Sequence, residues 1–159
     1  MKPEEHLGGL LREKGLKLAV AESCTGGLIA SRITDVAGSS DYFDAGVVAY
    51  SNEAKGTFLS VPAASIEAHG AVSREVAEKM AEGVRAASSA DIGLSVTGIA
   101  GPTGGSTEKP VGTVFIGLAT DNETLFRKFQ FAGSRLDVKS QTSEEALQFV
   151  IDLLEGKIA

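Results

Sequence analysis

The stretch LKLAVAESCTGGLIASRITDV, residues 16–36, decides the fold of this 159-residue chain. Residues 16–21 are a short apolar run bounded by turn-forming residues, which is typical of a buried β-strand. Residues 23–27 are rich in glycine and in hydroxyl side chains, so they predict a tight turn. Residues 28–36 then carry one mostly apolar stripe at helical spacing. The stretch therefore predicts a strand, a turn and a helix in that order.

Further helices and strands are expected on both sides of this unit. We expect helices over 3–14, 52–59, 62–70 and 74–88, a helix or helix pair over 135–154, and strands over 43–50, 92–96, 113–119 and 124–131. The last two strands flank Asp121-Asn122, which predicts a hairpin. Helix and strand alternate early in the chain, and this pattern favours a three-layer α/β/α domain with a mixed, mostly parallel sheet. The length predicts a single domain over residues 1–159.

The composition argues against several classes of partner and site. The net charge is -6 and there is no basic run, so nucleic acid and anionic membrane surfaces are poor partners. Cys24 is the only cysteine and there are only two histidines, which argues against a zinc site, and we expect no metal or cofactor. No apolar run approaches the roughly 20 residues of a membrane span, and no signal peptide is evident. We therefore expect a cytoplasmic protein.

The first segment with chemical potential is AESCTGG, residues 21–27. A hydroxyl at Ser23 would lie above the sheet edge, near backbone N–H groups of the next helix that can hold an oxyanion or a phosphate. This order of elements is like that of a nucleophile elbow, although the G-x-S-x-G pattern is absent. The alternative interpretation is a plain helix cap.

The second segment is YSNEAK, residues 50–55, at the end of another predicted strand. If the two strands are parallel, both segments lie at the carboxyl edge of the sheet, where ligands of open α/β sheets bind. A serine nucleophile needs a base, and neither histidine lies near a comparable turn. A desolvated Lys55 can serve because burial lowers the pKa of a lysine. The alternative interpretation is a solvated surface lysine.

The third segment is TGIAGPTGGSTEKPVG, residues 97–112. Closely spaced glycines let the backbone approach a phosphate or an amide, although the G-K-[ST] of a P-loop is missing. A surface loop is the alternative, but long loops in compact domains are more often functional. Arg135, at the start of the last predicted helix, is either a surface charge or an anion clamp.

On these segments the sequence resembles the CinA C-terminal domain family, the nicotinamide-nucleotide amidohydrolases. The resemblance extends from about residue 4 to residue 150, and its motifs occur in order. They are AESCTGG (21–27), DVAGSSDYFDAGVVAYSNEAK (35–55), HGAVSREVAEKMAEG (69–83) and SVTGIAGPTGGSTEKPVGTVFIGLA (95–119). Ser134 and Lys139 depart from the family, which often has Gly-Asp-Arg and then more basic residues in this region.

The resemblance implies hydrolysis of nicotinamide mononucleotide to nicotinate mononucleotide and ammonia, in pyridine-nucleotide recycling and without a metal. It implies Ser23 as the nucleophile, Lys55 as the base and Tyr50 as a partner in proton handling. Larger relatives carry a further N-terminal domain, so the resemblance implies a stand-alone form, and family members commonly form homo-oligomers. The candidate substrate-binding residues are Thr25, Gly26, Gly27, Thr97, Gly98, Gly101, Gly104, Gly105 and Arg135.

Two alternatives to this function stay open. Cys24 could be the nucleophile of a thiol amidase, because a helix N-terminus lowers the pKa of a thiol, but it lacks an obvious histidine partner. We expect its side chain to point away from the substrate and to pack as a small hydrophobe. The chain could also be a non-catalytic nucleotide-binding or regulatory module. The combination of Ser23, Tyr50 and Lys55 argues against that alternative.

Overall fold

Strand β1 (Leu18–Glu22) lies inside a five-stranded sheet of order β2-β1-β3-β4-β5 in the computed structural model, which describes residues 1–158. The other strands are β2 (Phe43–Val48), β3 (Ile92–Gly98), β4 (Thr113–Ala119) and β5 (Thr124–Gln130). β1 is parallel to β2 and to β3, whereas β4 is antiparallel to β3 and to β5. Only β4 therefore runs in the opposite direction. The predicted mixed sheet with a late hairpin is confirmed.

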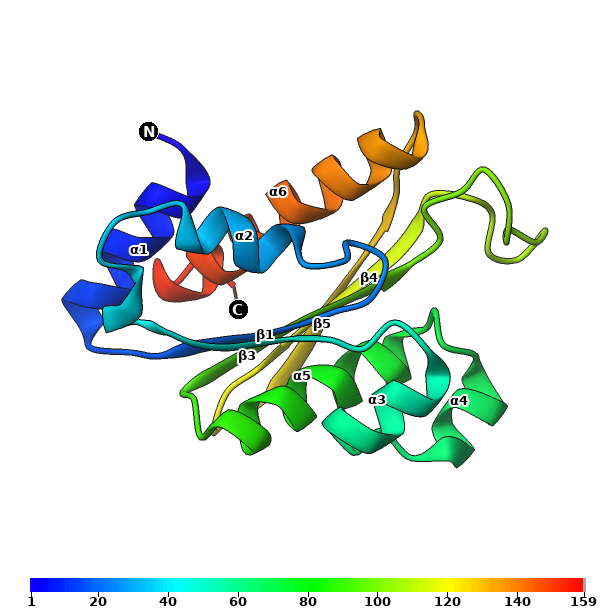
Figure 1. Cartoon of the computed structure of the whole chain (residues 1–159), viewed down its shortest axis with the longest axis horizontal. Helices are drawn as coiled ribbons and strands as arrows, with labels where there is room; N and C mark the ends of the chain where they lie inside the picture. The colour runs from blue at the N-terminus through cyan, green and yellow to red at the C-terminus, as the bar shows by residue number, and fades with distance from the viewer. Residues whose placement is uncertain (159) are drawn as a thin grey trace.

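Helices cover both faces of this sheet (Figure 1). The layer on one face consists of α1 (Pro3–Lys14), α2 (Leu28–Thr34) and α6 (Arg135–Leu154). The layer on the other face consists of α3 (Asn52–Leu59), α4 (Ala63–His69) and α5 (Arg74–Ser88), and a short 3₁₀ turn, η1, spans Ser39–Asp41. The predicted three-layer α/β/α arrangement is confirmed, and the last segment is one helix. None of the helices within residues 1–158 has the length and apolar character to cross a membrane.

The burial of the strands explains their sequence patterns. β1 and β4 are buried along their whole length, whereas the edge strand β2 alternates between half-buried and exposed residues. In β1, Leu18 and Val20 belong to the core under α1, α2 and α6. Ala19 and Ala21 belong to the core under α3 and α5. Because successive side chains of a strand point to opposite faces, a strand between two cores reads as a continuous apolar run.

Helix α5 packs closely against the sheet because two strand residues have no side chain. A Cβ atom at Gly93 would lie 2.2 Å from the carbonyl oxygen of Ala81, and one at Gly117 would lie 2.4 Å from that of Ala77. Both distances are too short for a real contact, so only glycine fits at these positions. The Ser95 hydroxyl donates to the Ala77 carbonyl, which further joins α5 to β3.

An ion cluster joins the three helices of the first layer. The Arg32 guanidinium of α2 donates to both carboxylate oxygens of Glu4 in α1, at 2.9 and 3.0 Å. It also donates to the Ser143 hydroxyl at 2.8 Å and to the Glu144 carboxylate, both in α6. Glu4 is almost fully buried, so this is a partly desolvated cluster rather than a surface pair. It fixes α2 relative to α1 and α6.

Candidate active site

Residues from several elements meet at a cavity of about 180 Å³ near the carboxyl ends of β1, β2 and β3. Ser23 and Cys24 come from the turn that follows β1, and Lys55 comes from α3. The cavity is lined by Ser23, Cys24, Tyr50, Asn52, Lys55, Ala71, Val72, Thr97, Gly98, Ala100 and Arg135. The side chains predicted to be catalytic are therefore brought together at the predicted edge of the sheet.

Lys55 is a buried lysine that donates toward Ser23. Lys55 is a residue of α3. The Ser51 hydroxyl caps the start of this helix by accepting a hydrogen bond from the Ala54 N–H. The Nζ atom lies 3.0 Å from the Ser23 Oγ atom, within range for direct proton transfer. It also donates to the carbonyl oxygens of Ala49 at 3.1 Å and Tyr50 at 3.2 Å. These contacts fix the amine against the hydroxyl.

The surroundings of Lys55 favour its neutral form. The residue is 1% exposed, and burial lowers the pKa of its ammonium group below the ordinary value. All three of its hydrogen-bond partners are neutral, and no carboxylate within residues 1–158 forms an ion pair with it. A buried lysine without a counter-ion loses its proton more readily, so Lys55 has the environment of a base rather than of a structural cation.

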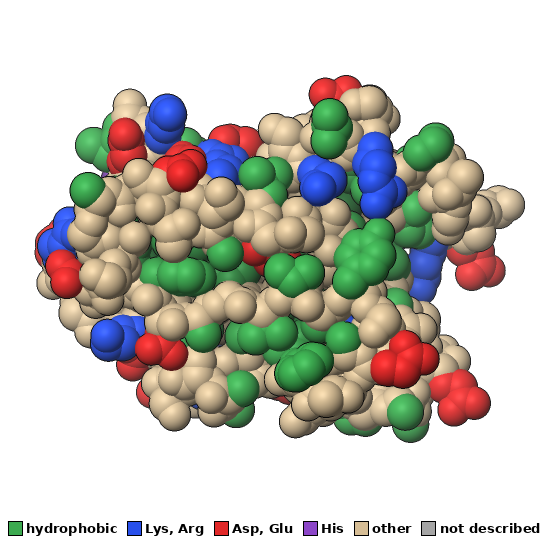
Figure 2. All heavy atoms as spheres, in the orientation of Figure 1, with side chains coloured by type: hydrophobic (Ala, Val, Ile, Leu, Met, Phe, Trp, Pro, Cys, Tyr) green, Lys and Arg blue, Asp and Glu red, His purple; other side chains and the backbone are tan. Residues whose placement is uncertain are grey.

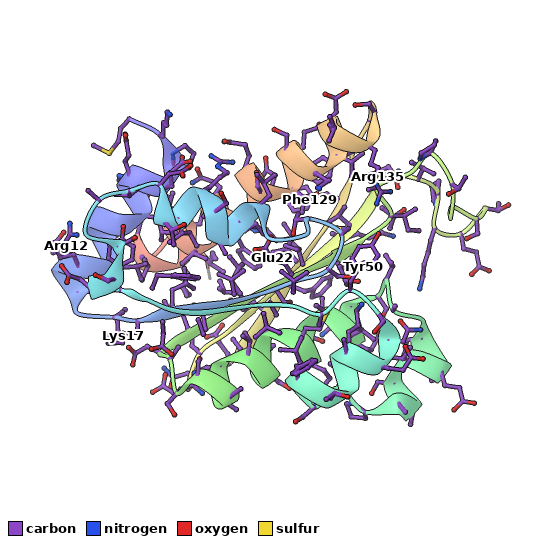
Figure 3. All side chains as sticks on the ribbon, in the orientation of Figure 1. Arg12, Lys17, Glu22, Tyr50, Phe129 and Arg135 are labelled. Carbon is purple, nitrogen blue, oxygen red and sulfur yellow. The ribbon has the colours of Figure 1, made fainter. Side chains whose placement is uncertain are left out.

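Tyr50 reaches the cavity but not the Ser23–Lys55 pair. Its side chain is 61% exposed, and its hydroxyl accepts a hydrogen bond from Arg135 Nη2 at 3.1 Å. Figure 3 shows Tyr50 and Arg135 at the same end of the sheet. Arg135 also donates through Nη1 to the Gly101 carbonyl at 2.7 Å, which holds the start of the 98–112 loop. Only the backbone carbonyl of Tyr50 contacts Lys55, so a proton-relay role for the phenol stays a prediction.

Glu22 organises the turn over residues 23–27, and it was not among the predicted site residues. Its carboxylate is 1% exposed and accepts from the Thr25 hydroxyl at 2.6 Å and from the N–H groups of Gly27, Ile29 and Ala30. It therefore saturates the first turn of α2, where a helix otherwise leaves free donors. The available signal in the sequence was an acidic residue at the end of an apolar run, directly before a glycine-rich turn.

Few backbone donors of the turn remain free for an oxyanion. The Gly26 N–H donates to the Ser23 carbonyl at 3.1 Å, and the Leu28 N–H donates to the Thr25 carbonyl. Within residues 1–158, the N–H groups of Cys24 and Thr25 donate to no backbone or side-chain oxygen. These two N–H groups are therefore the donors of the turn that remain available to an oxyanion.

Cys24 is buried but lies on the cavity. It is 6% exposed, and burial raises the pKa of its thiol to about 11. The predicted small-hydrophobe packing agrees with this burial, and Cys24 is one of the residues that line the cavity; the direction of its side chain stays a prediction. A helix N-terminus lowers the pKa of a thiol, but for Cys24 desolvation outweighs that effect.

The predicted substrate-binding residues divide into two groups. Thr97, Gly98 and Arg135 line the cavity, and Gly101 adjoins it through its contact with Arg135. The structure does not bring the others to the cavity: Thr25 lies buried beneath the turn, Gly26 and Gly27 form the turn itself, and Gly104 and Gly105 are exposed in the long loop. Asn52, Ala71, Val72 and Ala100 line the cavity and were not predicted.

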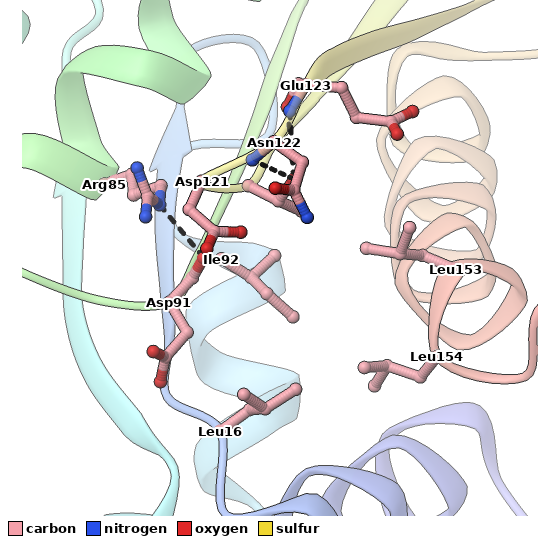
Figure 4. Close-up of a pocket in the computed structure, with 10 residues that line it drawn as sticks. Leu16, Arg85, Asp91, Ile92, Asp121, Asn122, Glu123, Leu153 and Leu154 are labelled. Atoms are coloured by element: carbon pink, nitrogen blue, oxygen red, sulfur yellow. Dashed lines mark hydrogen bonds between the residues drawn. The ribbon is translucent and has the colours of Figure 1, made fainter.

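A second cavity, of about 320 Å³, lies at the opposite edge of the sheet (Figure 4). Its polar groups largely bond to one another: Arg85 donates to the Asp91 carbonyl at 3.0 Å, and the Asp91 carboxylate accepts from the Lys17 N–H at 2.8 Å. Its lining includes a threonine and several carboxylates but no serine, cysteine or lysine, so it does not present a serine–lysine pair. Within residues 1–158 no cluster of His, Cys, Asp or Glu side chains forms a metal site.

Comparisons with known proteins point to one family. The model of the CinA C-terminal domain matches residues 1–154. A putative competence-damage inducible protein of Caldanaerobacter subterraneus subsp. tengcongensis is 51% identical over 97% of this chain, and a CinA-like protein of Citrifermentans bemidjiense is 56% identical over 92%. The chain spans only 37% and 36% of the length of these two relatives.

Solved structures agree with this assignment. The crystal structure of the competence/damage inducible protein CihA from Agrobacterium tumefaciens superposes with a TM-score of 0.90 at 40% identity, covering 96% of each chain. A competence or damage-inducible protein from Enterobacter asburiae superposes with a TM-score of 0.92 at 32% identity, again covering 96% of each chain. The chain therefore belongs to the CinA C-terminal domain family.

Proposed function

We propose that this protein is an amidohydrolase that converts nicotinamide mononucleotide to nicotinate mononucleotide and ammonia. The observation that carries the proposal is the buried contact of 3.0 Å between Lys55 Nζ and Ser23 Oγ. A serine hydroxyl paired with a neutral lysine is an activated nucleophile of the kind that acyl transfer requires. The substrate is proposed from the family resemblance of the motifs around both residues.

In the first half of the reaction, Ser23 Oγ attacks the amide carbon while Lys55 accepts the hydroxyl proton. The N–H groups of Cys24 and Thr25 stabilise the oxyanion, and each such donor contributes about 3 kcal/mol to lowering the barrier. Lys55 then returns the proton to the amide nitrogen, the C–N bond breaks and ammonia leaves. The product of this half is a nicotinoyl ester on Ser23.

In the second half, water attacks the ester carbon while Lys55 accepts a proton from the water. The C–O bond to Ser23 breaks, and Lys55 returns the proton to the serine oxygen. Nicotinate mononucleotide leaves, and both residues return to their initial states. Lys55 has to be neutral at the start of each half, and its burial supports that requirement.

The thiol alternative is disfavoured by the pKa of Cys24, which burial raises to about 11, so that almost no thiolate is present near neutral pH. The non-catalytic alternative leaves the Ser23–Lys55 pair without a purpose. A binding module gains nothing from a desolvated lysine, because an uncompensated buried amine lowers the stability of the fold.

The test is ammonia release from nicotinamide mononucleotide by the wild type, Ser23→Ala and Cys24→Ala, each checked for folding by circular dichroism. We expect Ser23→Ala to lose turnover and Cys24→Ala to keep most of it. Ser23 and Cys24 are neighbours in one turn, so each alanine variant is a matched control for the other. If activity requires Cys24 and not Ser23, the thiol mechanism replaces the serine mechanism. If the wild type releases no ammonia, the non-catalytic binding module is the remaining interpretation. A chelator should leave the rate unchanged.

A further inference from the structure

Glu22 is a buried carboxylate that the proposed reaction does not use. Figure 2 shows charged side chains mainly around the margin of one face, whereas Figure 3 places Glu22 near the start of α2, in the middle of the same view. Only three side chains of Asp, Glu, Lys or Arg are buried within residues 1–158: Glu4, Glu22 and Lys55. Glu4 is paired with Arg32, and Lys55 is the proposed base. Glu22 accepts only from neutral donors among these residues, so its burial needs another explanation.

The capping of helix α2 does not by itself require a carboxylate. Helices α3, α5 and α6 each begin after a serine whose hydroxyl accepts from one backbone N–H group: Ser51, Ser73 and Ser134. The N-cap of α2 is Gly27, which offers no side chain, and Glu22 in β1 accepts from the N–H groups there. A neutral hydroxyl is therefore sufficient to start a helix in this chain. A buried carboxylate without a cation costs more free energy than a neutral group, and it therefore points to a further role.

The Thr25 hydroxyl connects Glu22 to a free backbone donor. It donates to Glu22 Oε1 at 2.6 Å, and both residues are 1% exposed. A short hydrogen bond from a hydroxyl to a carboxylate is among the strong ones in proteins. The N–H group of the same threonine is one of the two donors of the turn that remain available to an oxyanion. Because the χ1 angle of threonine is restricted, holding its hydroxyl also constrains the backbone that carries this N–H group.

The turn over residues 23–27 has little else to hold its backbone in one conformation. Gly26 and Gly27 follow Thr25 with positive φ angles of 62° and 107°. Glycine adopts such angles freely, so these two residues give the turn access to other conformations. Glu22 counteracts this freedom, because it directly precedes the turn in the chain and also accepts from the Gly27 N–H at 3.2 Å. The segment with the nucleophile and both free N–H groups is thus held at its two ends by one carboxylate.

We propose that Glu22 is a positioning residue for the reaction, which holds the N–H groups of Cys24 and Thr25 in place for the oxyanion that forms on the amide oxygen. This inference rests on the proposed function, since that function supplies the reaction. Glu22 forms no side-chain hydrogen bond with Ser23 or Lys55, so it acts through Thr25. Donors that are fixed in advance stabilise the oxyanion without reorganising during the reaction. Their contribution belongs to the transition state, so Glu22 should affect kcat and not the binding of substrate.

The first test removes only the hydroxyl of Thr25. Thr25→Val nearly keeps the shape of the side chain, and we expect kcat for ammonia release from nicotinamide mononucleotide to fall about 10²-fold, the effect of losing one oxyanion donor. The Kd of nicotinamide mononucleotide, measured by isothermal titration in a Ser23→Ala background without turnover, should change less than about 3-fold, because the bound amide carries no oxyanion. Thr25→Ser keeps the hydroxyl that donates to Glu22 and should retain most of the kcat.

Thr142→Val is the matched control for this substitution. Thr142 is buried in α6, and its hydroxyl donates to the Val138 carbonyl at 2.7 Å. The control makes the same chemical change at a residue outside the cavity lining, so kcat should stay within about 2-fold of the wild type. Circular dichroism and urea unfolding check that each variant is folded under the assay conditions. A loss of rate is thereby separated from a loss of folded protein.

A second variant tests the carboxylate directly. Glu22→Gln keeps the size of the side chain, but its NH₂ group cannot accept a hydrogen bond, so kcat should fall at least as far as in Thr25→Val. The pH dependence of kcat should stay the same, because burial, rather than Glu22, lowers the pKa of Lys55. A shifted pH profile would show that Glu22 acts on Lys55, and it would overturn the route through Thr25. If Glu22→Gln does not fold, the threonine variants alone decide.

The possible outcomes distinguish this inference from the proposed function. A loss confined to kcat that Thr25→Ser recovers supports the positioning role. Folded Thr25→Val with the kcat of the wild type overturns that role and leaves the serine mechanism intact. A loss of affinity as large as the loss of kcat indicates a distortion of the whole cavity, and it overturns the role as well. A wild type that releases no ammonia overturns the proposed function itself, and this inference with it.

Discussion

Replacing Lys55 with methionine removes the amine while nearly keeping the length and volume of the side chain. The structure gives this change two separate consequences, because the amine contacts the Ser23 hydroxyl and is itself buried with 1% of its surface exposed. The first consequence concerns the rate of ammonia release, and the second concerns the pH dependence of folding stability. Both follow from the requirement that Lys55 be neutral in the folded protein.

For the rate, the loss is that of a positioned general base. Such groups contribute about 10²- to 10⁴-fold, so kcat/KM for nicotinamide mononucleotide should fall by that factor in Lys55→Met. Lys55→Arg should fall as far, because an arginine stays protonated and cannot accept the serine proton. An Arg variant with near-wild-type activity would show that position 55 supplies only a positive charge.

For stability, the sign follows from the direction of the pKa shift. Burial lowers the pKa of Lys55 in the folded state below its ordinary value of 10.5, so the unfolded chain binds more protons between the two pKa values. The free energy of unfolding of the wild type therefore rises with pH across that window, by up to about 1.4 kcal/mol per pH unit. Above 10.5 no penalty for deprotonation remains.

Lys55→Met lacks this titration, so the difference between the two proteins isolates it. At high pH the variant should be less stable by about 1–3 kcal/mol, because the Ala49 and Tyr50 carbonyls lose their donor. As the pH falls through the window, that deficit should shrink or reverse.

Urea unfolding at a series of pH values between 6 and 10.5 measures the effect, with Lys14→Met as the control for an exposed lysine. A difference in unfolding free energy that does not change with pH would refute a depressed pKa, and with it the assignment of Lys55 as a neutral base.

Three further predictions follow from the site. Tyr50→Phe should change the free energy of unfolding by less than about 0.5 kcal/mol, because the residue is 61% exposed. It should also reduce kcat far less than Ser23→Ala does. An equal loss of kcat would establish the phenol as a proton relay. With a pKa of about 11, Cys24 is a thiolate in only about one molecule in a thousand at pH 8, so iodoacetamide should modify it at least 100-fold more slowly than in urea, as followed by mass spectrometry. Glu22→Gln should lower the unfolding free energy by about 2–4 kcal/mol in urea titrations, because an amide cannot accept from all four donors; a change below about 0.5 kcal/mol would contradict the role of the carboxylate in the turn.

Local sequence patterns predicted the elements because the causes of those elements are local. Ser134 and Asp137 form a capping box at the start of α6, and the apolar run before Ser23 is a strand buried on both faces. The meeting of Ser23 and Lys55 was predictable for a similar reason. Each follows a strand, and parallel neighbouring strands end at the same edge of the sheet.

The remaining site residues depend on packing between distant elements. Ala71 and Val72 reach the cavity from the connection between α4 and α5, and no periodicity marks them as ligand contacts. Lys139 lies over Gly26 only because α6 packs beside α2. Gly104 and Gly105 show the converse, since glycine content predicts a flexible backbone but not the distance of a loop from the cavity.

The contacts of Arg32 affect the width of the cavity. Helix α2 begins after the turn that carries Ser23, and α6 begins at Arg135, so the width of the cavity between these two residues depends on the spacing between the two helices. Arg32 sets that spacing by binding the Ser143 hydroxyl and the Glu4 carboxylate. The contacts that set the width of the cavity thus lie outside its lining. Changes there would shift the preferred ligand length without altering any group that performs chemistry.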